Sequence, residues 1–229
     1  MKGVISMFFL DKYKSMNDEE KEELLKTLFM QTDTEYCNQA RKEYYATKLK
    51  YMGENVKIGT NVKFINPEHI SIGNNVIIMD DVTIIARGEG GVLIGDDCYL
   101  CERVYLDSER EDGYIKIGNR VYIGTGTTLF GHMGLEIGDF CLLAQNITIT
   151  PYSHISDNPD DIIWNQGGNC KKVTIGKDCY IGMGVCIMYT GDIGDGSVIG
   201  AGSTVVKPIE PFSIAVGTPA KVIRKRKTI

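Results

Sequence analysis

The chain has 229 residues, of which 43% are hydrophobic and 24% are charged, an ordinary composition for one soluble domain with at most a small appendage. The formal net charge of −5 argues against nucleic-acid binding as the main activity. The seven cysteines are an odd number and do not suggest a disulfide framework. No targeting segment or membrane span is visible, because the apolar run 4–10 is too short to cross a bilayer. A cytoplasmic location is therefore the default expectation.

Residues 1–51 are expected to form an N-terminal helical cap. Asn17 precedes a run of acidic residues and is a plausible helix N-cap. A second helix is expected to end near Gly53, and together the two helices would cover the open first coil of a solenoid. The first helix has an apolar face at helical spacing, made by Leu24, Leu25, Leu28 and Phe29.

From residue 52 to 210 the sequence repeats every six residues. The unit starts with an aliphatic residue, often followed by glycine, and has a small or β-branched residue in fifth place, as in IGTNVK (58–63), IGNNVI (72–77) and IGDDCY (94–99). Many hexapeptides in phase predict an all-β solenoid of short strands and tight turns. The aliphatic positions fall in groups of three, six residues apart, and the groups begin at residues 52, 72, 94, 117, 137, 175 and 193. This predicts about seven triangular coils of a parallel β-helix.

The extra residues always fall between groups, so one corner of the triangle should collect every insertion. The fifth position must be small to fit the triangular interior, and Cys98, Cys141 and Cys179 occupy it in three units. These cysteines are predicted to be inert core residues, which weakens the case for metal or redox chemistry at the pair Cys98 and Cys101. Glycine in second place suits the tight corner geometry.

The longest insertion, 150–174, is the first candidate for a functional loop, because long loops inside compact domains are uncommon and often functional. His154, one of three histidines, is expected to end the hexapeptide that starts at Ile149, so that the coil would hold it. Histidine titrates near neutral pH and can remove the proton of an attacking hydroxyl. The alternative is a solvated loop histidine. Backbone N–H groups near Gly182 and Met183 are candidates for stabilising an oxyanion.

Residues 211–229 are predicted to form a C-terminal strand and a basic tail. The last nine residues, KVIRKRKTI, hold five basic side chains and no acidic one. Such a tail is either solvated or able to hold a small phosphorylated ligand.

The repeat, the histidine at the base of a long loop and the ending IGAGSTVVKPIEPFSIAVGTPAKVIRK (199–225) resemble the left-handed β-helix acyltransferases. Within them the chain is similar to the O-acetyltransferases of sugars and polysaccharides, the relatives of galactoside and maltose acetyltransferases. The resemblance covers roughly residues 117–224. It implies a left-handed β-helix, acetyl-CoA as co-substrate, no required metal, and a homotrimer with each site in a groove between neighbouring chains.

The resemblance also implies roles for single residues. His154 follows NITITPYS (146–153) and stands at the position of the family's catalytic histidine. Residues implied to bind the cofactor are Tyr180 at an aromatic position, Gly182 and Met183 near the thioester, Ala201 beside the pantetheine arm, and Lys207 and Arg224 near the nucleotide end of CoA.

The acceptor side is less constrained. His132 should lie one layer from His154 on the same corner, either to contact the acceptor, to tune His154, or as a surface turn residue. Trp164, the only tryptophan, could stack on a sugar ring or pack against a neighbour, and Asp157 could orient His154. The family often has an acceptor-binding Asn one coil before the histidine, but that register falls near Gly124 and Thr125. His69 is expected to be structural.

These residues predict an acetyl-CoA-dependent O-acetyltransferase in which His154 is the general base and a saccharide hydroxyl attacks the thioester directly. The acceptor would be a small molecule or a glycan precursor, with no role for nucleic acid or membrane. One alternative is N-acetylation of an amino sugar. A zinc-dependent carbonic anhydrase-like protein is another; it requires three converging histidines, and the intervals of 63 and 22 residues between the three here lack a close pair. An inactive scaffold is the third.

Overall fold

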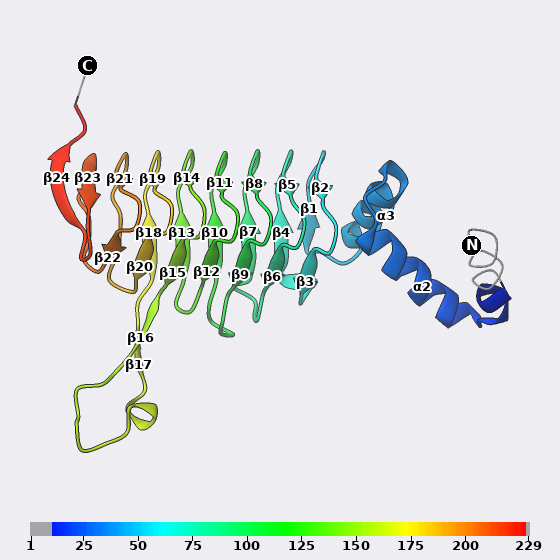
Figure 1. The fold of residues 1–229 in the computed structure, drawn as a ribbon, viewed down its shortest axis with the longest axis horizontal. Helices are drawn as coiled ribbons and strands as arrows, with labels where there is room; N and C mark the ends of the chain where they lie inside the picture. The colour runs from blue at the N-terminus through cyan, green and yellow to red at the C-terminus, as the bar shows by residue number, and fades with distance from the viewer. Residues whose placement is uncertain (1–10, 228–229) are drawn as a thin grey trace, which may run out of the picture.

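A computed structural model describes residues 11–227 (Figure 1). Two helices, α2 (Asp18–Gln31) and α3 (Glu35–Ala46), precede a row of stacked coils whose short strands form three sheets. The first sheet contains, in spatial order, β1 (Tyr51–Met52), β4 (Ile70–Ile72), β7 (Val92–Ile94), β10 (Ile115–Ile117), β13 (Leu135–Ile137) and β18 (Val173–Ile175).

The second sheet contains β2 (Lys57–Ile58), β5 (Ile77–Ile78), β8 (Tyr99–Leu100), β11 (Tyr122–Ile123), β14 (Leu142–Leu143), β19 (Tyr180–Ile181), β21 (Val198–Ile199), β23 (Ser213–Val216) and β24 (Lys221–Lys225). The third contains β3 (Lys63–Ile65), β6 (Thr83–Ile85), β9 (Tyr105–Asp107), β12 (Thr128–Phe130), β15 (Thr148–Thr150), β20 (Cys186–Met188) and β22 (Thr204–Val205). Every pair between successive coils is parallel, and isolated bridges from Ile175 to Ile193 and on to Ile209 continue the first sheet. The predicted solenoid of seven coils is confirmed, and it is consistent with a left-handed β-helix.

The register of the strands explains the repeat. Equivalent positions lie directly above one another: Ile58 pairs with Ile78, which pairs with Leu100. Their side chains are buried, and full burial of each such aliphatic side chain contributes about 1.5–3 kcal/mol. The cysteines in fifth place are buried as predicted, namely Cys98, Cys141 and Cys179. Burial raises the pKa of Cys98 to about 11, which disfavours the reactive thiolate.

The glycine in second place is required by close approach between coils rather than by the turn. A Cβ on Gly95 would lie 2.6 Å from the carbonyl oxygen of Gly118 in the next coil. The left-handed residue of the turn comes two positions later, at Asn75 with φ 57° and Asp97 with φ 57°. Asn and Asp tolerate this conformation better than other residues with a side chain, so the corner geometry depends on the fourth position.

The cap differs from the expected pair of helices over the first coil. The predicted N-cap at Asn17 is confirmed, with a full capping box to Glu20. Helix α3 covers the coil: Tyr45 is buried and its hydroxyl donates to the carbonyl of Val62. Arg41, also buried, donates to the carbonyls of Ile58 and Thr32. Helix α2 has no buried residue and lies mostly against α3 (Figure 1). It meets the first coil only at its C-terminal end, where the carbonyl of Met30 accepts a hydrogen bond from the N–H of Asn61 at 2.8 Å.

None of the helices within residues 11–227 has the length and apolar character needed to cross a membrane. At the other end of the solenoid, the predicted C-terminal strand is β24, which pairs antiparallel with β23 at the edge of the second sheet. Part of the basic tail is held there. Arg226 donates to the carboxylate of Asp178 and to the carbonyl of Gly196, both at 2.8 Å.

Candidate functional site

Two corners of the triangle carry the candidate residues. The tight corner joins the second sheet to the third and consists of residues 59–62, 79–82, 101–104, 124–127, 144–147, 182–185 and 200–203. The loop corner joins the third sheet to the first and consists of residues 66–69, 86–91, 108–114, 131–134, 151–172 and 189–192. All the long insertions lie at the loop corner, as the spacing predicts.

His154 lies at the loop corner, but the regular coil does not hold it as expected. The coil strand β15 ends at Thr150, and the chain then enters a hairpin of β16 (Tyr152–His154) and β17 (Gly168–Cys170), in which His154 pairs with Gly168. The hairpin projects from the solenoid (Figure 1). His154 is therefore an exposed residue on a short two-stranded ribbon, so its orientation depends on its neighbours there.

Tyr152 is the neighbour that orients His154. Its hydroxyl oxygen lies 3.2 Å from Nδ1 of His154, and the two rings meet edge to face with centroids 4.8 Å apart. When Nδ1 carries the proton and donates it to this oxygen, Nε2 keeps its lone pair, as a general base requires. The sequence suggested Asp157 for this role. Within residues 11–227, Asp157 is exposed and makes no hydrogen bond to His154.

His132 lies where the register placed it, next to the same group. Its ring stacks on Tyr152 with centroids 5.0 Å apart and planes 16° apart. Burial lowers the pKa of His132, and the nearby charge of Arg110 lowers it further, against the opposing effect of Glu109. Its Nδ1 is buried and has no hydrogen-bond partner among the described residues. His132 is therefore a neutral ring that supports Tyr152 at neutral pH.

The residues expected to bind the cofactor lie on the tight corner and the second sheet. Tyr180 and Met183 are exposed in the sixth coil, and Ala201 is exposed in the seventh. A Cβ on Gly182 would lie 2.5 Å from the amide nitrogen of Ala201, so this position needs glycine for close approach. The Gly182 N–H donates to Ile199 at 2.8 Å and cannot also stabilise an oxyanion. The neighbouring Met183 N–H has no acceptor within residues 11–227.

The other candidates are spread over the molecule. Gly124 and Thr125 also lie on the tight corner, where the Thr125 hydroxyl donates to Glu102 at 3.0 Å. Lys207 is exposed on the loop-corner side of the last coil, and Arg224 is exposed on β24. Trp164, in the short helix η2 (Ile163–Gln166) at the tip of the hairpin, is 87% exposed.

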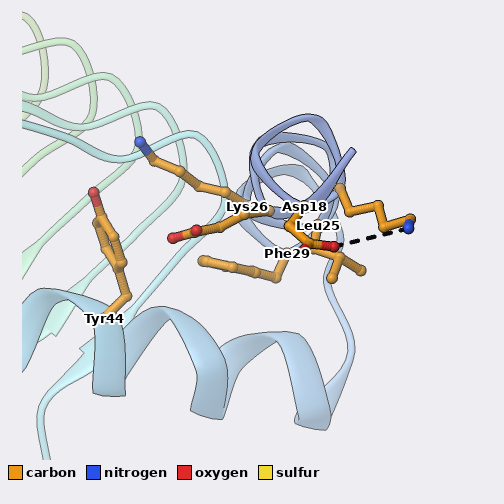
Figure 2. Close-up of a pocket in the computed structure, with 7 residues that line it drawn as sticks. Asp18, Leu25, Lys26, Phe29 and Tyr44 are labelled. Atoms are coloured by element: carbon orange, nitrogen blue, oxygen red, sulfur yellow. Dashed lines mark ion pairs between the residues drawn. The ribbon is translucent and has the colours of Figure 1, made fainter. Parts of the chain in front are cut away.

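One chain thus brings His132, Tyr152 and His154 together at the loop corner. It leaves Met183 and Ala201 at the tight corner, across the third sheet, and Tyr180 on the adjoining second sheet. Two cavities within residues 11–227 contain neither group. One, of about 400 Å³, lies between α2 and α3, where Lys26 reaches over the ring of Tyr44 at 5.4 Å (Figure 2). The other, of about 1010 Å³, lies between α3 and the first coils. No three His, Cys, Asp or Glu side chains within residues 11–227 are placed to hold a metal ion.

Comparison with known proteins gives the family. A family model described as the hexapeptide repeat of succinyl-transferase matches residues 114–151 and 172–207. The break between the two parts coincides with the hairpin. The chain is 32% identical to dTDP-4-amino-4,6-dideoxy-D-glucose acyltransferase of Escherichia coli, over 78% of this chain and 83% of that protein. The chain belongs to the hexapeptide-repeat acyltransferase family.

Other members of the family differ in length and acceptor. The chain is 37% identical to galactoside O-acetyltransferase of Escherichia coli K12, over 58% of this chain and 63% of the relative. It is 34% identical to a probable acetyltransferase of Mycobacterium tuberculosis over 72% of its own length, and it spans about half of that relative, 54%. Among solved structures, a variant of the N-acyltransferase AntD from Bacillus cereus, in complex with dTDP-4-amino-4,6-dideoxyglucose and coenzyme A, has a TM-score of 0.59 at 25% identity, over 82% of this chain and 90% of AntD.

Candidate residues could be found from the sequence when they lie within the repeat that the family shares. Residues in the repeat, such as Met183 and Ala201, have a register that can be matched by position. Tyr152, the group that contacts both histidines, gave no signal, because it lies where the repeat stops. Only its place two residues before His154 on an extended strand, hence on the same face, could have pointed to it.

Proposed function

We propose that this protein transfers an acetyl group from acetyl-CoA to a hydroxyl of a saccharide. The observation that carries the proposal is the pair of Tyr152 and His154, in which Nδ1 is engaged and Nε2 remains free on an exposed ring. Nε2 takes the proton of the acceptor hydroxyl as that oxygen attacks the thioester carbonyl. The tetrahedral intermediate then expels the CoA thiolate, which recovers the proton from the imidazolium. No enzyme-bound acyl intermediate is required.

The cofactor side of the proposal uses the tight corner. Tyr180, Met183 and Ala201 form an exposed surface over two successive coils, against which a pantetheine arm can lie. The Met183 N–H is the candidate donor to the developing oxyanion, because it is not used within the fold. Lys207 and Arg224 are exposed and supply charge for the phosphates of CoA. CoA in complexes of AntD supports this choice of co-substrate.

A homotrimer is part of the proposal, because the two halves of the site lie on different corners of one chain. A closed threefold assembly joins two different surfaces of successive chains, and in the proposed trimer these are the tight corner of one chain and the loop corner of the next. An exposed apolar column on the second sheet provides a surface for the contact, with Tyr122, Leu142 and Tyr180 in register. At the hairpin tip, Trp164 is free to stack on a sugar or to pack on a neighbouring chain.

Subunit mixing tests this arrangement. His154→Ala destroys one half of the site, and Ala201→Glu blocks the other half. Chains carrying one change each should be inactive alone, but co-expressed chains should regain on the order of a quarter of the wild-type activity, since each site draws its two halves independently. Absence of any recovery in mixed oligomers would place both halves in one chain.

N-acetylation of an amino sugar is the second candidate. One relative is the dTDP-4-amino-4,6-dideoxy-D-glucose acyltransferase of Escherichia coli, and the N-acyltransferase AntD binds dTDP-4-amino-4,6-dideoxyglucose. Release of CoA should be measured over paired acceptors that differ only in an amine or a hydroxyl. An acetyl ester is cleaved by hydroxylamine and an amide is not, so the treated product separates the two functions. A product that resists hydroxylamine would contradict O-acetylation, and no release with any acceptor would contradict both.

A further inference from the structure

An ion pair between a half-exposed arginine and a buried carboxylate lies at the loop corner, on the N-terminal side of the histidines. The guanidinium of Arg87 donates from Nε and Nη2 to the two carboxylate oxygens of Asp107, at 2.9 and 2.8 Å. The side chain of Asp107 is 1% exposed, whereas that of Arg87 is 46% exposed. The arginine thus has one edge bound to the protein and the other open to solvent.

Two further hydrogen bonds hold the carboxylate of Asp107 in place. It accepts further hydrogen bonds from the Tyr105 hydroxyl at 3.1 Å and from the Glu109 N–H at 2.8 Å. Burial alone would raise the pKa of Asp107, but the hydrogen bonds from Arg87, Glu109 and Tyr105 outweigh it and hold the pKa below its ordinary value. The backbone N–H of Arg87 donates to the Ser108 hydroxyl at 2.8 Å. The position and direction of the guanidinium are therefore fixed.

The pairing with Asp107 leaves part of the guanidinium unused. A guanidinium has five donors in a planar fork, and Asp107 uses only the Nε edge. The Nη1 group makes no hydrogen bond within residues 11–227. An arginine anchored in this way is suited to bind a second oxyanion, a carboxylate or a phosphate, with two parallel hydrogen bonds.

The arginine and His154 face the same corner, joined by a continuous row of aromatic rings. The row runs from Tyr105 to Phe130, His132, Tyr152 and His154, with centroid separations of 6.2, 6.0, 5.0 and 4.8 Å. The guanidinium of Arg87 is held on Asp107 in the third coil, two coils before the coil that leads into Tyr152, which corresponds to roughly 10 Å at the usual strand separation. One hexose does not bridge that distance, whereas a nucleotide-linked or oligomeric saccharide does.

We propose that Arg87, anchored by Asp107, binds an anionic group of the acceptor, so that the natural acceptor is a charged saccharide longer than one sugar unit. Its reacting hydroxyl or amine lies at His154, and its carboxylate or phosphate lies at Arg87. This inference rests on the proposed function, since it assumes that the loop corner holds the acceptor.

Matched acceptors test the inference. Lactose and sialyllactose differ by a sugar carrying a carboxylate, and galactose and UDP-galactose differ by a nucleoside diphosphate. Arg87→Gln alone would leave the Asp107 charge buried and unpaired, so the double variant Arg87→Gln/Asp107→Asn is used with Arg87→Lys. In the double variant, the ratio of kcat/KM for the charged member to that for its neutral partner should fall roughly 10- to 100-fold, as expected for loss of hydrogen bonds to a charged group. Arg87→Lys should give a smaller loss. The affected pair shows whether the anion is a carboxylate or a phosphate.

Arg120→Gln is the matched control, because Arg120 forms an exposed ion pair with Asp97 on the remaining corner of the triangle. It should leave both ratios unchanged. Equal losses for charged and neutral acceptors, or no preference for either charged acceptor in the wild type, would overturn the inference.

Equilibrium dialysis of the same four compounds against the protein with CoA tests the inference separately from the proposed function. Without CoA release the proposed function fails, yet weaker binding of a charged compound to the double variant would still support Arg87, and no binding of either charged compound to the wild type would reject it.

Discussion

The tight corner and the loop corner belong to the same repeat, yet the number of residues is constant at the tight corner and variable at the loop corner. Every tight corner has four residues, and the third of them is always in the left-handed region, as in Asn61, Asp81, Gly126 and Gly202. The loop corner varies from the four residues of 131–134 to the whole hairpin segment 151–172. A corner whose length cannot change is suited to a partner common to a family, and a corner that accepts insertions is suited to a feature that differs between members. This matches our placing of acetyl-CoA on the first and the acceptor on the second.

Removal of His154 is the strongest test of this division. We expect His154→Ala to lower the rate of CoA release by roughly 10²- to 10⁴-fold, the usual effect of losing a general base, with little change in the affinity for acetyl-CoA. Steady-state kinetics and a CoA-binding titration measure the two effects. His69→Ala is the control, since His69 lies on the same corner before the second coil, in the short helix η1 (Pro67–His69). Equal rates for wild type and His154→Ala would contradict the assignment of the base.

Stability should reside in the regular coils. In β7, Ile94 is buried and the adjacent Leu93 is 46% exposed. Ile94→Ala should lower the free energy of unfolding by about 2–5 kcal/mol, because it removes packed methyl groups and leaves a cavity. Leu93→Ala should change it by less than about 0.5 kcal/mol. Urea denaturation followed by circular dichroism measures both. Similar losses for the two variants would show that the inward and outward positions are assigned wrongly.

The sequence predicted the coils almost completely, because the repeat encodes the same physical requirement at each layer. Ile58, Ile78 and Leu100 must each fill the same interior, so their phase fixes the strands and the single corner that accepts insertions. The cap was predicted less well. An apolar face at helical spacing indicates that α2 is a helix, but not that most of it lies against α3 and that only its C-terminal end meets the first coil.

The structural setting of the candidate site residues was predictable only for those that lie within the repeat. His154 could be found from its motif, but its hairpin could not, because an antiparallel pair such as Tyr152 with Cys170 leaves no periodic signal in so short a strand. The ion pair of Arg87 and Asp107 was missed for a related reason. Asp107 ends a strand and Arg87 lies two residues after one. Only the stacking of successive coils, about 20 residues apart in sequence, brings them together.

Tyr152 tests whether the hairpin orients the base. Tyr152→Phe keeps the ring that packs between the two histidines but removes the hydroxyl next to Nδ1. We expect kcat to fall about 3- to 10-fold, the value of one hydrogen bond of modest strength, with an unchanged KM for acetyl-CoA. Tyr114→Phe is the control, because it removes a loop-corner hydroxyl that donates to Glu136 instead. An equal fall in both variants, or none in Tyr152→Phe, would mean that His154 keeps its orientation without this bond.

Replacement of His132 should have the smallest effect, a change in how the free energy of unfolding depends on pH. Burial holds the pKa of His132 below the ordinary value of 6.5, so the unfolded chain takes up this proton at a higher pH than the folded chain does. The contribution to stability is therefore complete above about pH 6.5 and is lost as the pH falls from there toward the lower pKa of the folded state. His132→Phe can keep a ring against Tyr152 and cannot titrate, so its free energy of unfolding should decline less between about pH 7.5 and 5.5, by up to about 1 kcal/mol. Urea denaturation at both pH values measures this, and an equal decline in variant and wild type would show that the ring takes up its proton as easily in the folded chain as in the unfolded one.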